Sequence, residues 1–240
     1  MSGSPSAIRL VTFDAGGTLL HPHPTVGAIY AEVLTRRGFP CDPREVGQAF
    51  ERAWVSILER PSIERYGRAA NGERRYWSEL LILIVEELGG AEAPEGAADE
   101  LFDRFARPES WRVFPEVPAI LEELSQRGLQ MAVVSNWDSR LPALLRDLGL
   151  RAFFGPILVS ALEACEKPDP RIFWMAAQRA GVSPEEALHV GDQDREDLEG
   201  ARGAGFHALK IERDAGGGPG LEAVIDWLDR SKSSRRESRR

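Results

Sequence analysis

Apolar and polar residues follow two different rhythms along the chain. Residues 8–13 (IRLVTF) are mostly apolar or β-branched, which predicts a short buried strand near the N-terminus. From about residue 25 to residue 107, apolar residues recur at helical spacing, and glycine or proline marks the points where helices end or begin. The expected helices lie near residues 26–38, 43–60, 73–90 and 94–106.

Beyond residue 111 the pattern changes to short apolar strands that alternate with amphipathic helices. The expected strands lie near residues 130–136, 156–160, 187–192 and 207–211, and each is followed by a helical segment. Such alternation is typical of a parallel sheet with right-handed crossover helices. The predicted fold class is therefore α/β, with the helical block inserted between the first and second strands of the sheet.

The same pattern predicts how the chain is divided into domains. Residues 1–21 and 110–230 are expected to form an α/β core domain, and residues 22–109 an inserted helical domain. The end of the chain, SKSSRRESRR, has no apolar positions, so residues 231–240 are expected to form a disordered basic tail.

Composition narrows the class of protein further. The net charge is −8 although the tail is basic, so the body is more acidic still, which argues against nucleic acid as a partner. Two cysteines, Cys41 and Cys165, are too few for a disulfide framework and indicate reduced thiols in a cytoplasmic protein. The first residues lack the pattern of a secretory signal, and the longest apolar run, residues 80–85, is too short to cross a membrane. No feature specifies an oligomeric state.

Polar residues stand at the ends of several expected strands. Asp14 ends the first strand, Ser135 and Asn136 end the second, and Asp192 ends the fourth. Lys167 follows the third strand in the turn-rich stretch CEKPDP. The carboxyl ends of parallel strands lie along one edge of a sheet, which is where open α/β sheets bind ligands. We therefore expect these side chains to gather into one site.

The residue types in this set favour phosphoryl chemistry. Clustered carboxylates repel one another, and Mg2+ relieves that repulsion because it prefers oxygen ligands. Asp14 could then act as a nucleophile that forms an aspartyl-phosphate. Lys167 would offset the charge of the transferring group, and Ser135 and Asn136 would donate hydrogen bonds to its oxygens. From its own stretch alone, Asp14 could also be a residue that caps a turn.

Four motifs in this order resemble those of the haloacid dehalogenase (HAD) superfamily. They are Asp14 with GGTL, Ser135-Asn136, Lys167 before PDP, and the stretch GDQDRED that contains Asp192. The inserted helices resemble the C1-type cap of subfamily IA, and SNWDSRL, EKPDPRIF and HVGD are most similar to the branch of HAD-like hydrolase domain-containing proteins. The resemblance implies a Rossmann-like core with a helical cap, a bound Mg2+ and, most often, hydrolysis of a small phosphate monoester.

The resemblance also implies a role for each residue that matches a motif. Asp14 would be the nucleophile, and Lys167 would order the nucleophile and the phosphate group. The metal would be bound by Asp14, by Asp192 and by the backbone carbonyl of Gly16. Ser135 and Asn136 would bind the phosphate group. Asp197 would support Lys167 or the metal shell.

Gly16 departs from the pattern of the family's phosphatases, whose first motif is Asp-x-Asp. The second Asp of that motif is the general acid and base, and Gly16 keeps the backbone carbonyl but lacks the carboxylate. A general acid contributes roughly 100- to 10,000-fold in rate, so slow turnover of poor leaving groups is expected. His21 and His23 could carry protons instead, although an extended proline-rich loop explains them as well. His189 lies within an apolar strand and is expected to be a core residue.

Two other functions remain open. Haloacid dehalogenases of the superfamily also lack the second Asp, because halide leaves without a proton, but they work without Mg2+ and have lost the metal-binding acid that Asp192 represents here. A weakly active or non-catalytic HAD fold that binds a ligand or a protein would also explain Gly16, but such a scaffold does not need the intact pair of Asp14 and Lys167. The function expected first is therefore a Mg2+-dependent phosphatase that acts on a small phosphorylated metabolite.

Overall fold

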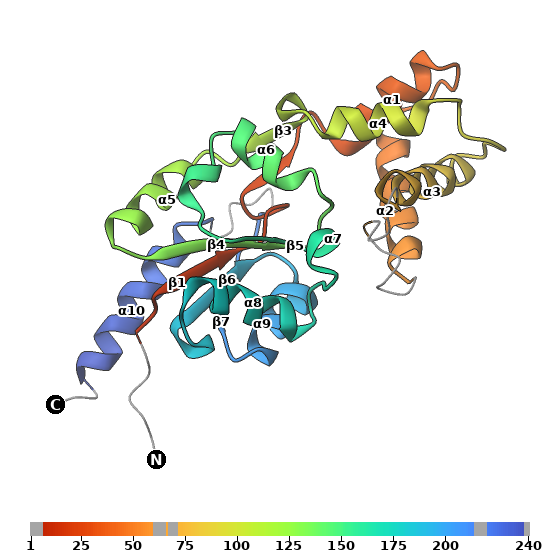
Figure 1. Ribbon diagram of the computed structural model, residues 1–240. Coiled ribbons are helices and arrows are strands. Elements are labelled where there is room, and N and C mark those ends of the chain that lie inside the picture. The colour runs from red at the N-terminus through yellow and green to blue at the C-terminus, as the bar shows by residue number, and fades with distance from the viewer. Residues whose placement is uncertain (1–6, 60–65, 67–71, 214–219, 238–240) are drawn as a thin grey trace. The chain divides into compact units, whose positions relative to one another are not determined.

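The computed structural model describes residues 7–59, 66, 72–213 and 220–237. The chain forms two compact units, both drawn in Figure 1. The first, the core unit, contains Met1–His21, Val113–Asn136 and Leu148–Arg240. The second, the helical unit, contains Pro22–Arg112 and Trp137–Asp147. The chain therefore leaves the core unit twice, once after His21 and once after Asn136.

A five-stranded parallel sheet forms the centre of the core unit (Figure 1). The strands lie in the order β5-β4-β1-β6-β7, and every neighbouring pair runs parallel. Their bounds are Leu10–Phe13 (β1), Gln130–Ser135 (β4), Ile157–Val159 (β5), Ala187–Gly191 (β6) and His207–Lys210 (β7). This arrangement confirms the predicted α/β fold class with a Rossmann-like parallel sheet.

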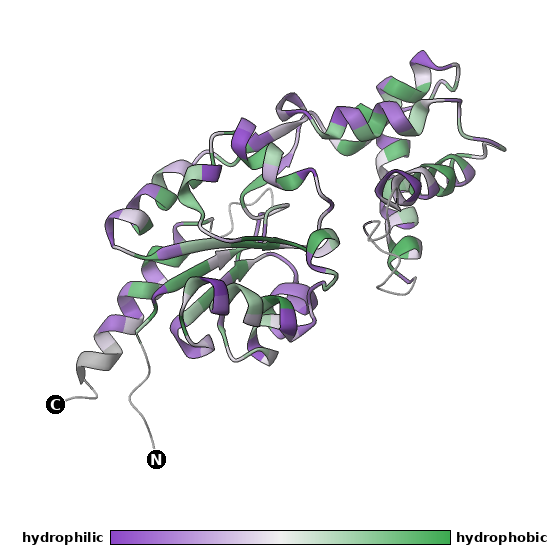
Figure 2. Ribbon diagram, in the orientation of Figure 1, coloured by the Kyte–Doolittle hydropathy of each residue, from purple (hydrophilic) through white to green (hydrophobic). Residues whose placement is uncertain are grey.

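Helices cover both faces of this sheet. The helices of the core unit are α5 (Val117–Gln126), α7 (Ser160–Glu163), α8 (Pro170–Ala180), α9 (Gly200–Gly203) and α10 (Ala223–Glu237), and the unit also has 3-10 turns at Arg151–Phe153 and Pro184–Glu186 and a π-helical turn at Asp194–Glu199. Figure 1 shows α5 on one face and α8 with α9 on the other. The strands between them are apolar in Figure 2, and Leu10, Val11 and Phe13 of the central strand β1 are fully buried. Burial on both faces explains why every residue of β1 except Thr12 is apolar.

The helical unit contains α1 (Val26–Arg36), α2 (Pro43–Leu58), α3 (Gly72–Glu87), α4 (Ala97–Phe105) and α6 (Leu141–Asp147), with a 3-10 turn at Pro108–Ser110. Side chains define where its first helices begin. Thr25 accepts a hydrogen bond from the Ala28 N–H, and Asp42 accepts one from the Arg44 N–H, as N-cap residues do. Within the described residues, none of the helices of either unit is long and apolar enough to span a membrane.

Residues 137–147 pack with α3 and α4, although the sequence pattern assigns them to the core domain. Asp138 is fully buried and accepts a hydrogen bond from Trp77 Nε1 of α3 at 2.7 Å. The Arg140 guanidinium pairs with the same carboxylate and lies 3.9 Å from the ring centroid of Phe102 on α4. These contacts pair a buried acid with a base and a ring N–H, which a buried charge requires.

Two further features differ from the expectations of the sequence. β2 (Leu20–Pro22) and β3 (Trp111–Val113) form a separate two-stranded sheet, and both are too short to produce a periodic pattern. Helix α10 continues to Glu237 and therefore includes much of the stretch that is expected to be disordered. Arginine, lysine and glutamate have good helix propensity, which explains how a polar end can continue a helix. Residues 238–240 lie outside the described residues.

The buried face of α5 allows a test of the core. Leu121 on this helix is fully buried, whereas Leu162 on α7 is 57% exposed. Leu121→Ala should lower the free energy of unfolding by about 2–5 kcal/mol, because it removes buried methyl groups and leaves a cavity. The matched exposed change, Leu162→Ala, should lower it by less than about 0.5 kcal/mol. Urea unfolding followed by circular dichroism measures both, and equal losses would contradict the assignment of this face to the core.

Candidate active site

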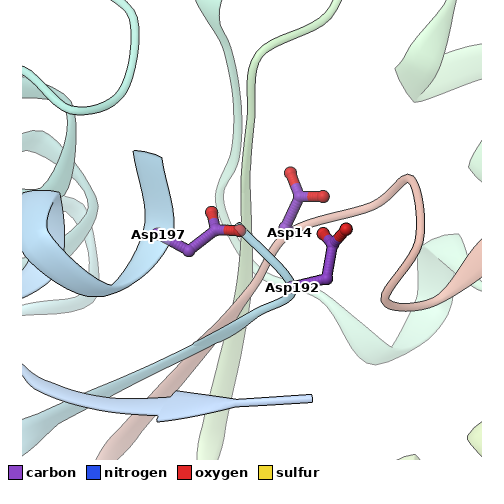
Figure 3. Close-up of side chains that lie close together, drawn as sticks. All are labelled: Asp14, Asp192 and Asp197. Atoms are coloured by element: carbon purple, nitrogen blue, oxygen red, sulfur yellow. The ribbon is translucent and has the colours of Figure 1, made fainter. Parts of the chain in front are cut away.

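The candidate site lies at the edge of the sheet where the parallel strands end. Asp14 directly follows β1, Ser135 is the last residue of β4, and Asp192 directly follows β6. Because β1 is the parallel neighbour of both other strands, the three carboxyl ends meet at one edge. Figure 3 shows Asp14 and Asp192 close together, with Asp197 reaching towards them from the π-helical turn that follows β6.

Lys167 Nζ lies between two of these carboxylates. It is 2.6 Å from Asp14 Oδ1 and 2.5 Å from Asp197 Oδ1, and the lysine side chain is 2% exposed. Ser135 Oγ donates another hydrogen bond to Asp14 Oδ1, at 2.9 Å. A buried ammonium requires such pairing, because an uncompensated charge in the interior is costly. Both hydrogen bonds to Asp14 fall on Oδ1, and Oδ2 takes no part in them.

Asn136 holds the main chain that carries Lys167. Its Nδ2 donates to the Lys167 carbonyl at 2.9 Å, and its Oδ1 accepts from the Lys167 N–H at 2.8 Å. The side-chain amide thus joins the end of β4 to the lysine loop at two points. Both ends of the amide engage protein groups, whereas the sequence pattern predicts that Asn136 donates to a bound phosphate.

The carboxylate cluster has the composition of a divalent cation site. Asp14, Asp192 and Asp197 each offer an oxygen, and these oxygens all lie within 4.8 Å of one another. Asp192 Oδ1 is buried and has no hydrogen-bond partner among the described residues. A buried polar atom without a partner is rare and costly, and a hard cation would satisfy this one. The residues therefore fit Mg2+.

The backbone at position 17, in the loop after Asp14, requires a glycine. The φ of Gly17 is +75°, and a Cβ at this position would lie 2.7 Å from Asp192 Oδ2. The left-handed backbone and the close approach both exclude a larger side chain. The adjacent Gly16 pairs with Leu20 in the same turn. The glycines therefore let the loop after β1 pass directly against the carboxylate of Asp192.

The electrostatic environment shifts the pKa values of Asp14 and Asp197, the two acids that Lys167 contacts, in opposite directions. Burial raises the pKa of Asp14 to about 6, and the carboxylates of Asp197 and Asp192 raise it too, although Lys167 acts in the opposite direction. The pKa of Asp197 lies well below its usual range, because Lys167 and His189 together outweigh the effect of burial. Burial lowers the pKa of Lys167, but the two carboxylates outweigh it and hold that pKa above its ordinary value.

One buried residue contacts the cluster and a second contacts that residue, although the sequence pattern predicts neither of them as a site residue. His189 on β6 is 1% exposed, and its Nε2 lies 3.0 Å from Asp197 Oδ1. Its Nδ1 lies 2.8 Å from Thr12 Oγ1 on β1. A lone histidine in an apolar strand is expected to be a core residue. Its position three residues before Asp192, in a strand that is otherwise apolar, is the signal that could have identified it.

A set of contacts around Arg213, which the sequence pattern also does not predict, holds the loop that follows Asp14. Arg213 Nη2 donates to the Thr18 carbonyl at 2.6 Å, and the Arg213 guanidinium pairs with Glu116 and lies 3.8 Å from the Phe114 ring centroid. The His21 ring packs on the same phenylalanine, with centroids 4.8 Å apart. These residues are far apart in the sequence, so no local pattern could join them.

Comparison with known proteins defines the class of this molecule. A family model for haloacid dehalogenase-like hydrolase matches residues 8–205, so the parallel α/β core and its acidic site belong to a hydrolase. More specifically, the chain belongs to the haloacid dehalogenase-like hydrolase family, as its motifs predict. It is 36% identical over 222 residues to haloacid dehalogenase-like hydrolase domain-containing protein 3 of Mus musculus, covering 91% of this chain and 86% of that protein. It is 39% identical over 227 residues to phosphoserine phosphatase of Thermus thermophilus, covering 86% of this chain and 89% of that protein.

Solved structures share the fold. The HAD-hydrolase YfnB from Bacillus subtilis bound to magnesium is similar with a TM-score of 0.71 at 21% identity, covering 93% of this chain and 100% of that chain. L-2-haloacid dehalogenase from Xanthobacter autotrophicus is similar with a TM-score of 0.63 at 25% identity, covering 91% of this chain and 81% of that chain. Both a phosphatase and dehalogenases therefore occur among the similar proteins.

The charge of Asp14 should reduce the stability of the cation-free protein at high pH. Its pKa is raised from 3.8 to about 6 by folding, so ionisation of Asp14 favours the unfolded chain. In EDTA, Asp14→Asn should therefore raise the free energy of unfolding at about pH 8 by about 1–3 kcal/mol. The gain should shrink as the pH falls below about 6, because the folded wild type then takes up the proton, and it should vanish below the ordinary pKa.

The control for this prediction is Asp194→Asn. The side chain of Asp194 is 71% exposed and pairs with Lys210 at 2.8 Å, and exposed pairs contribute little, so the same change there should lower the free energy of unfolding by no more than about 1 kcal/mol. Urea titrations of the wild type and both variants at several pH values measure the differences. A lower stability of Asp14→Asn than of the wild type at high pH would contradict the predicted sign.

Proposed function

We propose that the protein is a Mg2+-dependent phosphatase that hydrolyses a small phosphorylated metabolite through an aspartyl-phosphate on Asp14. One observation supports this function most directly. Lys167 and Ser135 hold Asp14 by a single oxygen, next to the buried oxygen of Asp192 that has no partner among the described residues. Membership of a hydrolase family supports hydrolysis, and the relative named phosphoserine phosphatase supports a phosphate monoester as the substrate.

Asp14 would attack phosphorus through Oδ2. Lys167 and Ser135 both bind Oδ1, which fixes the rotation of the carboxylate and leaves Oδ2 for the new bond. As the bond from Oδ2 to phosphorus forms, the bond from phosphorus to the leaving oxygen breaks, and that oxygen takes a proton from water. Lys167 stabilises the negative charge of the transferring group. Water then attacks the phosphorus of the aspartyl-phosphate, which releases phosphate and restores Asp14.

Asp14 and Asp192 are the side chains best suited to hold Mg2+, and the resemblance adds the carbonyl of Gly16 as a ligand. Asp192 Oδ1 is buried without a partner among the described residues, so a cation there would satisfy it. When bound, the ion would neutralise charge on the substrate phosphate and on the two carboxylates.

Asp197 is better suited to support Lys167 than to bind the metal. Its Oδ1 already accepts hydrogen bonds from Lys167 Nζ and His189 Nε2, and its Oδ2 accepts one from the Gln193 N–H at 3.0 Å. Each bond would have to be weakened for the carboxylate to turn towards a cation. Of the two roles that the family resemblance implies for Asp197, we therefore favour support of Lys167.

The helical unit would serve as the cap that selects the substrate. Three of its aromatic side chains form a stack in which the Trp54 ring centroid lies 5.8 Å from that of Phe50 and 5.9 Å from that of Trp77, with the rings nearly parallel. Large rings of this kind provide contact area with few freely rotating bonds. A lid built on them would exclude water and recognise the part of the substrate that carries no phosphate.

Dehalogenation of a 2-haloacid is the second candidate, and Gly16 favours it because a halide leaves without a proton. The similar structure of the Xanthobacter autotrophicus dehalogenase is consistent with it. The carboxylate of Asp192, beside an ionised Asp14, would repel a substrate carboxylate unless a cation intervened. Phosphate hydrolysis with Mg2+ therefore agrees better with the whole cluster.

Hydrolysis of an aryl phosphate tests the nucleophile and the metal. An aryl leaving group needs little protonation, so this activity does not depend on the missing acid. The wild type should hydrolyse p-nitrophenyl phosphate with Mg2+ and lose that activity in EDTA. Asp14→Asn should lower kcat at least about 1,000-fold, because an amide cannot form the aspartyl-phosphate.

Two acid-to-amide variants control for the metal in the same assay. Asp192→Asn should raise the Mg2+ concentration for half-maximal rate by about tenfold or more, and the exposed Asp194→Asn should leave it unchanged. If the wild type does not hydrolyse aryl phosphates but releases halide from 2-haloacids, the dehalogenase is the correct function. Inactivity in both assays would leave a HAD fold that binds a ligand or a protein.

The missing acid can be tested with two leaving groups. Gly16→Asp should raise kcat/KM for an alkyl phosphate such as O-phosphoserine by up to about 100-fold, because an alkoxide needs a proton to leave. The gain for the aryl phosphate should be much smaller. Gly16→Asn has the same shape without the acid and should give neither gain. Equal gains for the two variants would show that Gly16 limits the reaction by some means other than proton transfer.

A further inference from the structure

His189 is a buried titratable residue that the proposed reaction does not use. It lies on β6, and its ring packs edge-on against Phe173, with centroids 5.0 Å apart. That contact needs only an apolar surface. Both ring nitrogens nevertheless meet polar partners, with Nε2 3.0 Å from Asp197 Oδ1 and Nδ1 2.8 Å from Thr12 Oγ1. A residue that served only to fill the core would need neither of these contacts.

The direction of the contact with Asp197 follows from chemistry. Asp197 Oδ1 is paired with the ammonium of Lys167, and an ionised carboxylate only accepts hydrogen bonds. His189 Nε2 must therefore carry the proton and donate it. The Gln193 N–H donates to the other oxygen, Oδ2, at 3.0 Å. Two donors from β6 and the turn after it thus fix the Asp197 carboxylate independently of Lys167.

Lys167 depends on that fixed carboxylate. A lysine side chain has a flexible four-carbon stem, and its ammonium can turn towards any acceptor within reach. Here Nζ lies 2.5 Å from Asp197 Oδ1 and 2.6 Å from Asp14 Oδ1, so Asp197 determines where the ammonium meets the nucleophile. If Asp197 lost the donor at Oδ1, its carboxylate could rotate and carry the ammonium away from Asp14.

We propose that His189 is a positioning residue of the active site, whose Nε2–H fixes Asp197 and thereby fixes the Lys167 ammonium on Asp14 Oδ1. The contacts form one chain from the interior of the sheet to its edge: Thr12, His189, Asp197, Lys167 and Asp14. His189 touches no reacting atom. Only the kinetic test of this role rests on the proposed function, because the position of the Lys167 ammonium can be observed without turnover.

Three substitutions at position 189 separate this role from core filling. Gln has the reach to place its amide nitrogen where Nε2 of the imidazole lies, so His189→Gln keeps a donor for Asp197. Asn is shorter and reaches only the position of Nδ1, so His189→Asn stays polar but loses that donor. His189→Leu fills the space without any donor. A matched packing control is Phe206→Leu, because the Phe206 ring also packs on Phe173, with centroids 5.7 Å apart.

The kinetic arm uses p-nitrophenyl phosphate with saturating Mg2+. His189→Asn and His189→Leu should lower kcat by about 10- to 100-fold with little change in KM, the range typical of lost supporting contacts. His189→Gln should retain kcat within about threefold of the wild type. Phe206→Leu should lower stability without this loss of kcat. Urea unfolding of every variant provides the folded fraction to which the rates are normalised.

The second arm observes the ammonium directly and needs no activity. The chain has only three lysines, Lys167, Lys210 and Lys232, so a protein labelled with 15N-lysine gives few side-chain signals. A buried, hydrogen-bonded ammonium exchanges slowly with water, and Lys167→Met identifies its signal by removing it. The Lys167 signal should persist in His189→Gln and shift or disappear in His189→Asn and His189→Leu.

The outcomes decide between positioning and packing. If His189→Asn keeps both the Lys167 signal and the kcat of His189→Gln at equal folded fraction, the positioning role is wrong. If His189→Leu does not fold, the pair of Gln and Asn variants still decides the question. If the wild type hydrolyses no phosphate, the proposed function fails, and the spectrum of Lys167 alone tests the role of His189.

Discussion

The ammonium of Lys167, buried between Asp14 and Asp197, is the interaction on which the site depends. It joins three segments that are far apart in the sequence: the end of β1, the loop before α8 and the turn after β6. Removing the lysine would leave its two carboxylates buried without a counterion, and breaking a buried ion pair in this way costs roughly 3–5 kcal/mol. The strand ends are therefore held together by these ion pairs as well as by the hydrogen bonds of the sheet. The ion pair with Lys167 also fixes the orientation of the Asp14 carboxylate.

The same cluster carries more negative than positive charge. Lys167 balances one carboxylate, while Asp14, Asp192 and Asp197 all lie within reach of one another. Burial raises the pKa of Asp14, and the neighbouring carboxylates raise it further, while Asp192 has an oxygen that no described group satisfies. A fold selected only for stability would remove such an imbalance. Its persistence here is what a site prepared for a cation and an anionic group requires.

Much of this arrangement can be predicted from the sequence, because it follows from strand ends. The apolar run before Asp14 predicts β1, and the parallel sheet predicts that Asp14, Ser135 and Asp192 share an edge. The side-chain contacts could not be predicted in the same way. The hydrogen bonds of Asn136 to the main chain of Lys167 depend on a loop conformation that no periodic pattern encodes.

Contacts over long sequence distances explain the remaining differences. Thr12 and His189 lie on neighbouring strands and meet only through the register of β1 and β6, where they stand directly opposite each other. Arg213 reaches Thr18 from the far end of the chain. The short strands β2 and β3 form because they pair with each other, and the polar end of α10 forms because its residues have good helix propensity. Apolar periodicity predicts neither of these features.

The helical unit is assembled from two separate stretches of chain, and this limits how such a protein can be recombined. A chimera that received Pro22–Arg112 from a relative would keep its own Asp138 but lose the indole of Trp77 and the ring of Phe102 that accompany the Asp138–Arg140 pair. That pair would then face foreign side chains. Residues 22–112 and 137–147 thus form one discontinuous module, which must be exchanged whole or altered by single substitutions.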